Sequence, residues 1–183
     1  MRSYTRSVAF LAVLMLPTFA AAAPLPHDDS GHERHEAARS PFVDAVRRAT
    51  ERFLDVRNAG PDYVPVLGCV SGPLEGAMGV HFLNQALVDD EVRADSPEAL
   101  IYEFRNGTAR LVGVEYIVPA AAWHATHAPE DVPVLEGQLL QFVDSPNRFG
   151  LPAHYELHVW AWRENPNGAF VDWHPRVSCE GRQ

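Results

Sequence analysis

The sequence predicts an α+β domain in which an N-terminal amphipathic helix packs on a curled antiparallel sheet, shaped as a barrel or half-barrel. Three observations favour this class. One stretch with helical apolar spacing follows residue 40, several short strand-like runs come after it, and no second stretch has a convincing helical period. An antiparallel sheet must cover an apolar face, and the helix is the one element available to pack on it or to plug one end.

The first 23 residues predict a cleaved secretory signal. Arg2 and Arg6 come before an apolar run at 8–16, and four alanines follow at 20–23. The apolar run is shorter than the roughly 20 residues needed to cross a bilayer, and no later stretch approaches that length. We therefore expect a protein exported to the periplasm or the medium, with no stable membrane insertion.

A single domain is expected over residues 40–183, after a polar lead-in at 24–39 that has no apolar period and is interpreted as flexible. Ser40 is the predicted N-cap of the helix and Pro41 lies in its first turn. The helix is expected to continue to Gly60, because its apolar residues recur at steps of three and four. These are Phe42, Val43, Val46, Ala49, Phe53 and Val56.

Five runs after Pro61 are typical of strands, at 78–83, 100–105, 109–118, 138–143 and 154–162. Asn106 and Gly107 separate the second run from the third and form a strong hairpin signal. In the register that this turn sets, Glu103 faces Arg110 across the ladder as an opposite-charge pair. The spacing therefore predicts an antiparallel meander.

Two cysteines, Cys69 and Cys179, predict a disulfide, because an even pair in an exported chain is usually oxidised. Closing so long a loop stabilises the fold by about 4 kcal/mol if the loss of unfolded-chain entropy dominates. The alternative, two metal-binding thiols, lacks the close spacing of structural zinc sites. The formal net charge of −9 also makes nucleic acid an unfavourable partner.

The run at 154–162 carries the residues most suggestive of chemistry. Strand alternation places Tyr155, Leu157, Val159 and Ala161 on one face. Polar and aromatic side chains occupy the other face, and Glu156 and His158, at i and i+2, can reach a shared point. His81 points away from the apolar face of its strand, and Glu115 is predicted to share the face of Leu100, Tyr102, Phe104 and Leu111. The candidate ligands for a divalent transition metal are His81, Glu115, Glu156 and His158.

Two other hypotheses stay open beside the metal site. The curled sheet can hold a small apolar or aromatic molecule, with a candidate pocket of Tyr102, Phe104, His154, Trp160 and Trp162. The protein can instead be an envelope-associated interaction protein without catalysis. The sequence contains no nucleophile-elbow, phosphate-loop or dinucleotide motif. No motif therefore assigns an enzymatic activity, and the question of catalysis stays open.

Several segments resemble a family of exported bacterial proteins that has no assigned activity. The segments are GAMGVHFLN at 76–84, LVGVEY at 111–116, HYELHVW at 154–160, and NPNGAF at 165–170 followed by Trp173 and Cys179. The resemblance covers roughly residues 62 to 180 and implies one coherent domain. It implies no substrate and no catalytic residue.

Overall fold

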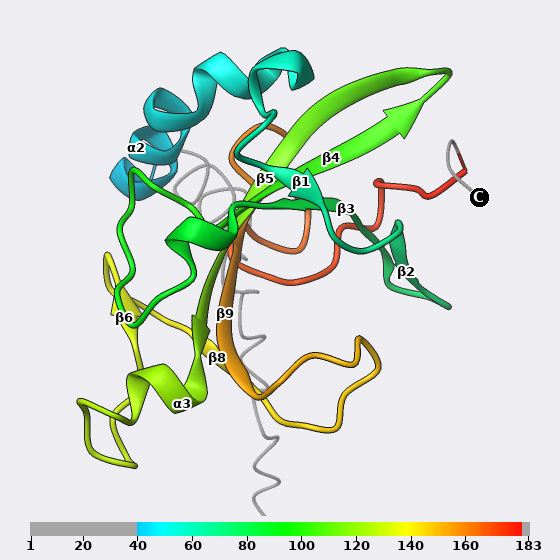
Figure 1. Ribbon diagram of the computed structural model, residues 1–183. Coiled ribbons are helices and arrows are strands. Elements are labelled where there is room, and N and C mark those ends of the chain that lie inside the picture. The colour runs from blue at the N-terminus through cyan, green and yellow to red at the C-terminus, as the bar shows by residue number, and fades with distance from the viewer. Residues whose placement is uncertain (1–39, 181–183) are drawn as a thin grey trace, which may run out of the picture.

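The computed structural model describes residues 40–180, so the predicted signal and lead-in lie outside the described residues. A seven-stranded antiparallel sheet runs in the order β1-β3-β4-β5-β9-β8, and β2 also pairs with β3 (Figure 1). A separate two-stranded ribbon consists of β6 (Val134–Leu135) and β7 (Gln138–Leu139). The sheet strands are β1 (Val64–Pro65), β2 (Val70–Gly72), β3 (Gly76–Leu83), β4 (Ala99–Arg105), β5 (Thr108–Pro119), β8 (Gln141–Val143) and β9 (His154–Val159).

The α+β class is confirmed in its coarse form, as a mostly antiparallel sheet accompanied by a short helix. The sheet is not closed: β1 and β8 stand at the two ends of its strand order. Of the two predicted shapes, a barrel or a half-barrel, the closed barrel is therefore wrong. The expected run at 138–143 is also divided between the ribbon and the main sheet, because β7 pairs with β6 whereas β8 pairs with β9.

Helix α2 (Pro41–Thr50) lies over the sheet and buries Phe42, Val43 and Val46. It is shorter than the periodicity predicts, and two 3-10 turns follow it, η1 (Glu51–Leu54) and η2 (Val56–Asn58). Asp55 is extended and its side chain accepts a hydrogen bond from the backbone of Arg57. This local bond competes with helix continuation. Ser40 occupies the N-cap position without a side-chain capping bond.

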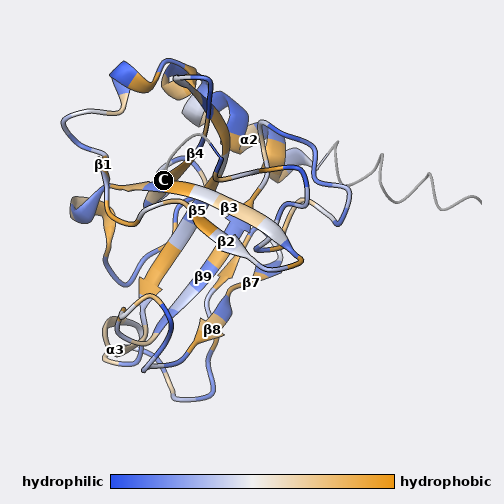
Figure 2. Ribbon diagram, turned by 90° about the vertical axis from the view of Figure 1, so that its right-hand side faces the viewer, coloured by the Kyte–Doolittle hydropathy of each residue, from blue (hydrophilic) through white to orange (hydrophobic). Residues whose placement is uncertain are grey.

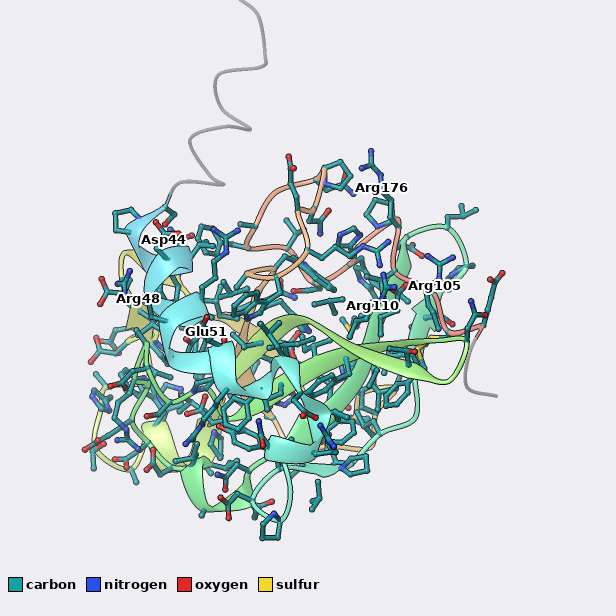
Figure 3. The ribbon with its side chains drawn as sticks, turned by 90° about the horizontal axis from the view of Figure 1, so that it is seen from above. Asp44, Arg48, Glu51, Arg105, Arg110 and Arg176 are labelled. Atoms are coloured by element: carbon teal, nitrogen blue, oxygen red, sulfur yellow. A yellow bond between two sulfur atoms is a disulfide. The ribbon has the colours of Figure 1, made fainter. Side chains whose placement is uncertain are left out.

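The β4–β5 hairpin agrees with the predicted turn. Asn106 and Gly107 both have positive φ, 51° and 75°, and Glu103 pairs in register with Arg110. The ion-pair partner of Glu103 is nevertheless Arg163, which approaches from the C-terminal segment. Figure 3 shows Arg105 and Arg110 on the side of the molecule where Arg176 also lies, away from Asp44 and Arg48 of α2 and Glu51 of η1.

A β-bulge in β5 changes the face on which Glu115 lies. Ile101 pairs with Gly113 but the next residue of β4, Tyr102, pairs with Leu111, so Val112 is the extra residue. The bulge reverses the alternation, and Glu115 lies opposite Ala99, away from Leu100 and Tyr102. The prediction that Glu115 shares the face of Leu100, Tyr102, Phe104 and Leu111 is therefore wrong. Gly113 suits this place, because a Cβ there would lie 2.8 Å from the Val159 carbonyl oxygen.

Two apolar clusters cover the two faces of the sheet. The larger one lies between the sheet and α2. The smaller one lies under the C-terminal segment and contains Ala77, Ile101, Val112, Trp160 and Val177. The predicted disulfide is present and ties Cys69 to Cys179 beside this smaller cluster. The part of the chain that the structure describes contains no helix long and apolar enough to cross a membrane.

Glu98, directly before β4, predicts a pH dependence of stability. Its side chain is buried and accepts a hydrogen bond from the Ile117 backbone N–H at 3.1 Å. Burial raises the pKa of Glu98 from 4.5 to about 8, against a smaller lowering by that hydrogen bond. Because the pKa of Glu98 is higher in the folded state than in the unfolded state, folding takes up a proton at pH values between the two. The stabilising contribution is complete below about pH 4.5 and is lost as the pH rises through about 8.

Glu98→Gln keeps a hydrogen-bond acceptor and removes this titration. We expect the free energy of unfolding of the variant, minus that of the parent, to grow by about 1.4 kcal/mol per pH unit between pH 5 and 8. Urea unfolding of both proteins at one-unit intervals measures the difference. Taking the difference cancels the titration of the other buried groups. Parallel pH profiles would show that the Glu98 pKa is not raised.

Candidate metal centre

Three strands contribute one convergent cluster of side chains on the sheet face opposite α2. His81 comes from β3, Glu115 from β5 and His158 from β9. The register places Glu115 directly across from His158, while β4 separates β5 from β3. On β4, Ala99 stands opposite Glu115, and its methyl group leaves room for longer side chains to meet above it. The strand order and the bulge together bring the three side chains to one point.

The cluster is compact and shielded from solvent. The Nε2 atom of His81 lies 3.4 Å from Nε2 of His158 and 3.4 Å from Oε2 of Glu115. His158 Nε2 lies 3.9 Å from the other oxygen of Glu115. His81 is 5 % exposed, Glu115 6 % and His158 1 %. Three groups able to ligate a metal therefore face one another in a site that bulk water scarcely reaches.

The hydrogen bonding of the two imidazoles is incomplete. Among the side chains in the described residues, the buried nitrogen and oxygen atoms without a hydrogen-bond partner are His81 Nδ1 and His158 Nδ1. Asp172 Oδ1 lies 3.5 Å from His158 Nδ1, which is an ion-pair distance without hydrogen-bond geometry. Buried polar groups are normally paired, so two orphan atoms in one cluster require an explanation.

The pKa values of the two histidines are shifted in opposite directions. Burial, together with repulsion from His158, lowers the pKa of His81 from 6.5 to about 3. His81 is therefore a neutral imidazole with a free lone pair at neutral pH. Burial also lowers the pKa of His158, but attraction to Glu115 and Asp172 outweighs burial and raises it. Burial raises the pKa of the Glu115 carboxyl, against the smaller effect of His158.

Glu156 lies beside the cluster and is held by His154. The Nε2 atom of His154 is 3.1 Å from Glu156 Oε2, and its Nδ1 is 2.8 Å from the carbonyl oxygen of Pro152. Both ring nitrogens therefore face acceptors, which suits an imidazolium. Burial lowers the pKa of His154, but these two hydrogen bonds outweigh burial and raise it. Glu156 also belongs to a second group of potential ligands, with His158 and Asp172.

A cavity of about 430 Å³ lies over one side of the cluster. His81, Glu115, His154 and Glu156 are among its lining residues, whereas His158 is not. All six residues of β9 are buried although the strand is rich in histidine and glutamate, which appears as hydrophilic colour within the sheet in Figure 2. The remaining wall is mostly apolar and includes Val66, Val70, Met78, Ile117, Phe149 and Leu151.

The aromatic pocket predicted from the sequence does not come together. Tyr102 donates to the Phe53 carbonyl on the α2 side of the sheet, and Phe104 stacks near Phe82. β9 ends at Val159, and Trp160 donates to the Val171 carbonyl while Trp162 donates to Thr50. Of the five residues proposed for this pocket, which are Tyr102, Phe104, His154, Trp160 and Trp162, His154 alone lines the cavity.

Sequence reasoning did not identify Asp172. This residue lies in an irregular C-terminal segment, where no strand or helix period indicates which way a side chain points. Its position next to His158 depends on how that segment folds back over the sheet. An aspartate in an irregular segment has no sequence pattern that shows which residues it will contact. The position of Asp172 next to His158 therefore becomes apparent in the tertiary structure alone.

The fold and the cluster define an antiparallel α+β domain with a buried group of His and Glu side chains whose donor atoms are close enough together to hold a metal ion. Comparison of the chain with protein families, curated proteins and solved structures found no match.

Proposed function

We propose that this protein binds one divalent transition metal ion, zinc being the best fit, through His81 Nε2, His158 Nε2 and the Glu115 carboxylate. Imidazole and carboxylate are common zinc ligands, and three protein ligands are typical of sites that keep one position open. Metal-binding residues on separate strands of a rigid sheet also need little rearrangement to bind an ion.

The observation that carries the proposal is the pair of facing imidazoles. Their Nε2 atoms are 3.4 Å apart while both Nδ1 atoms lack a hydrogen bond. A tetrahedral ion with bonds of about 2.1 Å requires ligand atoms about 3.4 Å apart, by simple geometry. The two shorter separations in the cluster therefore match the edge of a zinc tetrahedron.

Asp172 supports the same reading. Histidines that bind a metal through one nitrogen usually donate the other N–H to a carboxylate or carbonyl, which fixes the ring and its tautomer. Asp172 lies next to His158 Nδ1, on the side away from His81 and Glu115. A small shift of this 24 % exposed side chain would complete that hydrogen bond.

A purely structural polar network accounts for the cluster less well. Such a network is favourable when every member is satisfied, and incomplete pairing in a low-dielectric interior is costly. Here two imidazole Nε2 atoms face each other at 3.4 Å, and a hydrogen bond between them requires one of the two to carry a proton. A metal ion would use both Nε2 lone pairs at once.

The proposed cellular location is outside the cytoplasm. The disulfide supports export, since such bonds persist mainly in oxidising compartments. We also propose that the chain belongs to the exported bacterial family that its sequence segments resemble. Neither proposal affects the chemistry of the cluster.

Zinc titration of the tag-free chain tests the metal proposal. The parent carries His27→Asn, His32→Asn and His35→Asn, which remove histidines outside the described residues. After treatment with a chelator, zinc is titrated in competition with a chromophoric chelator. We expect one zinc per chain. His81→Ala, Glu115→Gln and His158→Ala should each lose more affinity than the roughly 10- to 100-fold typical of an outer-shell change.

Two further variants serve as controls. Asp172→Asn should weaken zinc binding by roughly 10- to 100-fold without abolishing it. His127→Ala removes an exposed histidine that stacks on Trp123, and it should bind zinc like the parent. Circular dichroism establishes that each variant is folded. The affinities of the parent and of His158→Ala are compared for zinc, manganese, iron, nickel and copper. The proposal is overturned if the parent binds none of these metals more tightly than the variant does.

A further inference from the structure

We infer that the cavity above the cluster binds a small aliphatic monocarboxylate, whose carboxylate completes the coordination of the metal while its hydrocarbon chain fills the apolar part. This inference rests on the proposed metal site and names the class of ligand that the site takes.

The position of the metal ligands supports a bound head group. His81 and Glu115 line the cavity, and a His158 donor atom lies within 4.8 Å of theirs without lining it, so an ion held by all three would border the cavity. Three protein ligands leave one position of a tetrahedron unfilled. Glu156 is excluded from the group formed by His81, Glu115 and His158, because its oxygens do not approach all three donor atoms closely enough.

The charge of the cavity selects an anion. Counting only groups at the cavity, a divalent ion with the Glu115 carboxylate carries a net charge of about +1, because Asp172, which faces His158 Nδ1, does not line the cavity. His154 and Glu156 form an ion pair beside it and cancel each other. No arginine lines the cavity in the described part of the chain, and the sequence contains no lysine. The metal is therefore the cation available to a carboxylate there, and an amine would meet no free carboxylate.

The apolar wall of the cavity favours a hydrocarbon chain as the rest of the ligand. Valine, leucine, isoleucine and methionine side chains make up most of the apolar part of the wall, with Phe149 as the single phenyl ring. Val66 is 47 % exposed and Leu151 37 %, so the apolar lining continues to the surface. The volume lies in the range of sites for small organic molecules. An unbranched aliphatic chain leading from a polar end matches this arrangement.

Calorimetric titration with straight-chain carboxylates of four to twelve carbons tests the inference, on zinc-loaded and zinc-free protein. We expect affinity for the zinc-loaded form to rise about fourfold per methylene until the cavity is full. Zinc-free protein should bind the same acids at least tenfold more weakly. Octylamine and octanol, with the same chain and a different head group, should bind more weakly than octanoate. In the cobalt form, octanoate should change the visible spectrum of the metal.

Wall variants separate cavity binding from binding elsewhere. Ile117→Trp and Val88→Phe each place bulk in the cavity and should keep one zinc per chain while losing the chain-length dependence. Leu139→Trp adds the same bulk at an exposed position in β7 and should behave like the parent. Circular dichroism and zinc stoichiometry report whether each variant is intact.

The outcomes distinguish the two proposals. Stoichiometric zinc with no carboxylate binding, or with equal binding by zinc-free protein, overturns the ligand inference and leaves the metal site standing. Absence of binding of zinc, manganese, iron, nickel and copper alike overturns the metal site, and the ligand inference with it. Carboxylate binding that is unchanged in both wall variants places the ligand outside the cavity and also overturns the inference.

Discussion

Arg163→Met is expected to lower the free energy of unfolding by about 3 to 5 kcal/mol. Arg163 pairs with Glu103, whose side chain is 1 % exposed, and the other Glu103 oxygen accepts from the Ser178 backbone N–H at 3.1 Å. Removing the arginine leaves a buried carboxylate without its countercharge, which is far costlier than losing a surface pair. Urea unfolding monitored by tryptophan fluorescence measures the effect.

A double-mutant cycle with Glu103→Gln isolates the charge. The pair Glu103→Gln and Arg163→Met should be more stable than Arg163→Met alone, because no buried charge remains. Arg110→Met is the matched control. Arg110 faces Glu103 across the ladder but is exposed, so its replacement should change stability by no more than about 0.5 kcal/mol. Equal losses for the two arginine variants would contradict the assignment of Arg163 as the partner.

Replacement of both cysteines, as Cys69→Ser with Cys179→Ser, is expected to destabilise the protein by about 4 kcal/mol. The bond spans 110 residues, so its loss releases a long loop in the unfolded chain. It also fixes the C-terminal segment that covers Ile101, Val112 and Trp160. Urea unfolding of the oxidised parent and the double variant gives the difference.

Reductant provides the control for the disulfide. Dithiothreitol should lower the stability of the parent to a value near that of the serine variant, and it should leave the variant unchanged. A parent whose unfolding midpoint does not respond to full reduction, confirmed by thiol titration, would show that the crosslink contributes little to stability.

Local sequence signals determined the elements whose causes are themselves local. Asn106-Gly107 specified the hairpin and the pairing of Glu103 with Arg110, because a tight turn sets the register of the strands beside it. Alternation along β9 correctly separated Tyr155 and Leu157 from Glu156 and His158. The disulfide followed from the number of cysteines and the expected compartment.

The candidate site shows where such signals stop. His81, Glu115 and His158 were grouped from their residue types, yet the predicted face of Glu115 was wrong. The bulge at Val112 and Gly113 reverses that face, and the close approach of the Val159 carbonyl to Gly113 is a contact between strands far apart in the sequence. A period-two pattern cannot show where one residue will be left out of the ladder.

The sequence by itself thus determined the α+β class, most strand positions, the hairpin and the cysteine pair. The tertiary structure alone decided that the sheet stays open, that Glu115 lies on the sheet face of His81 and His158, that Asp172 lies next to His158, and that a cavity adjoins the cluster. The physical reason is the range of the forces involved. Turn chemistry and alternation act over a few residues, whereas a buried site is set by how distant strands and loops pack together.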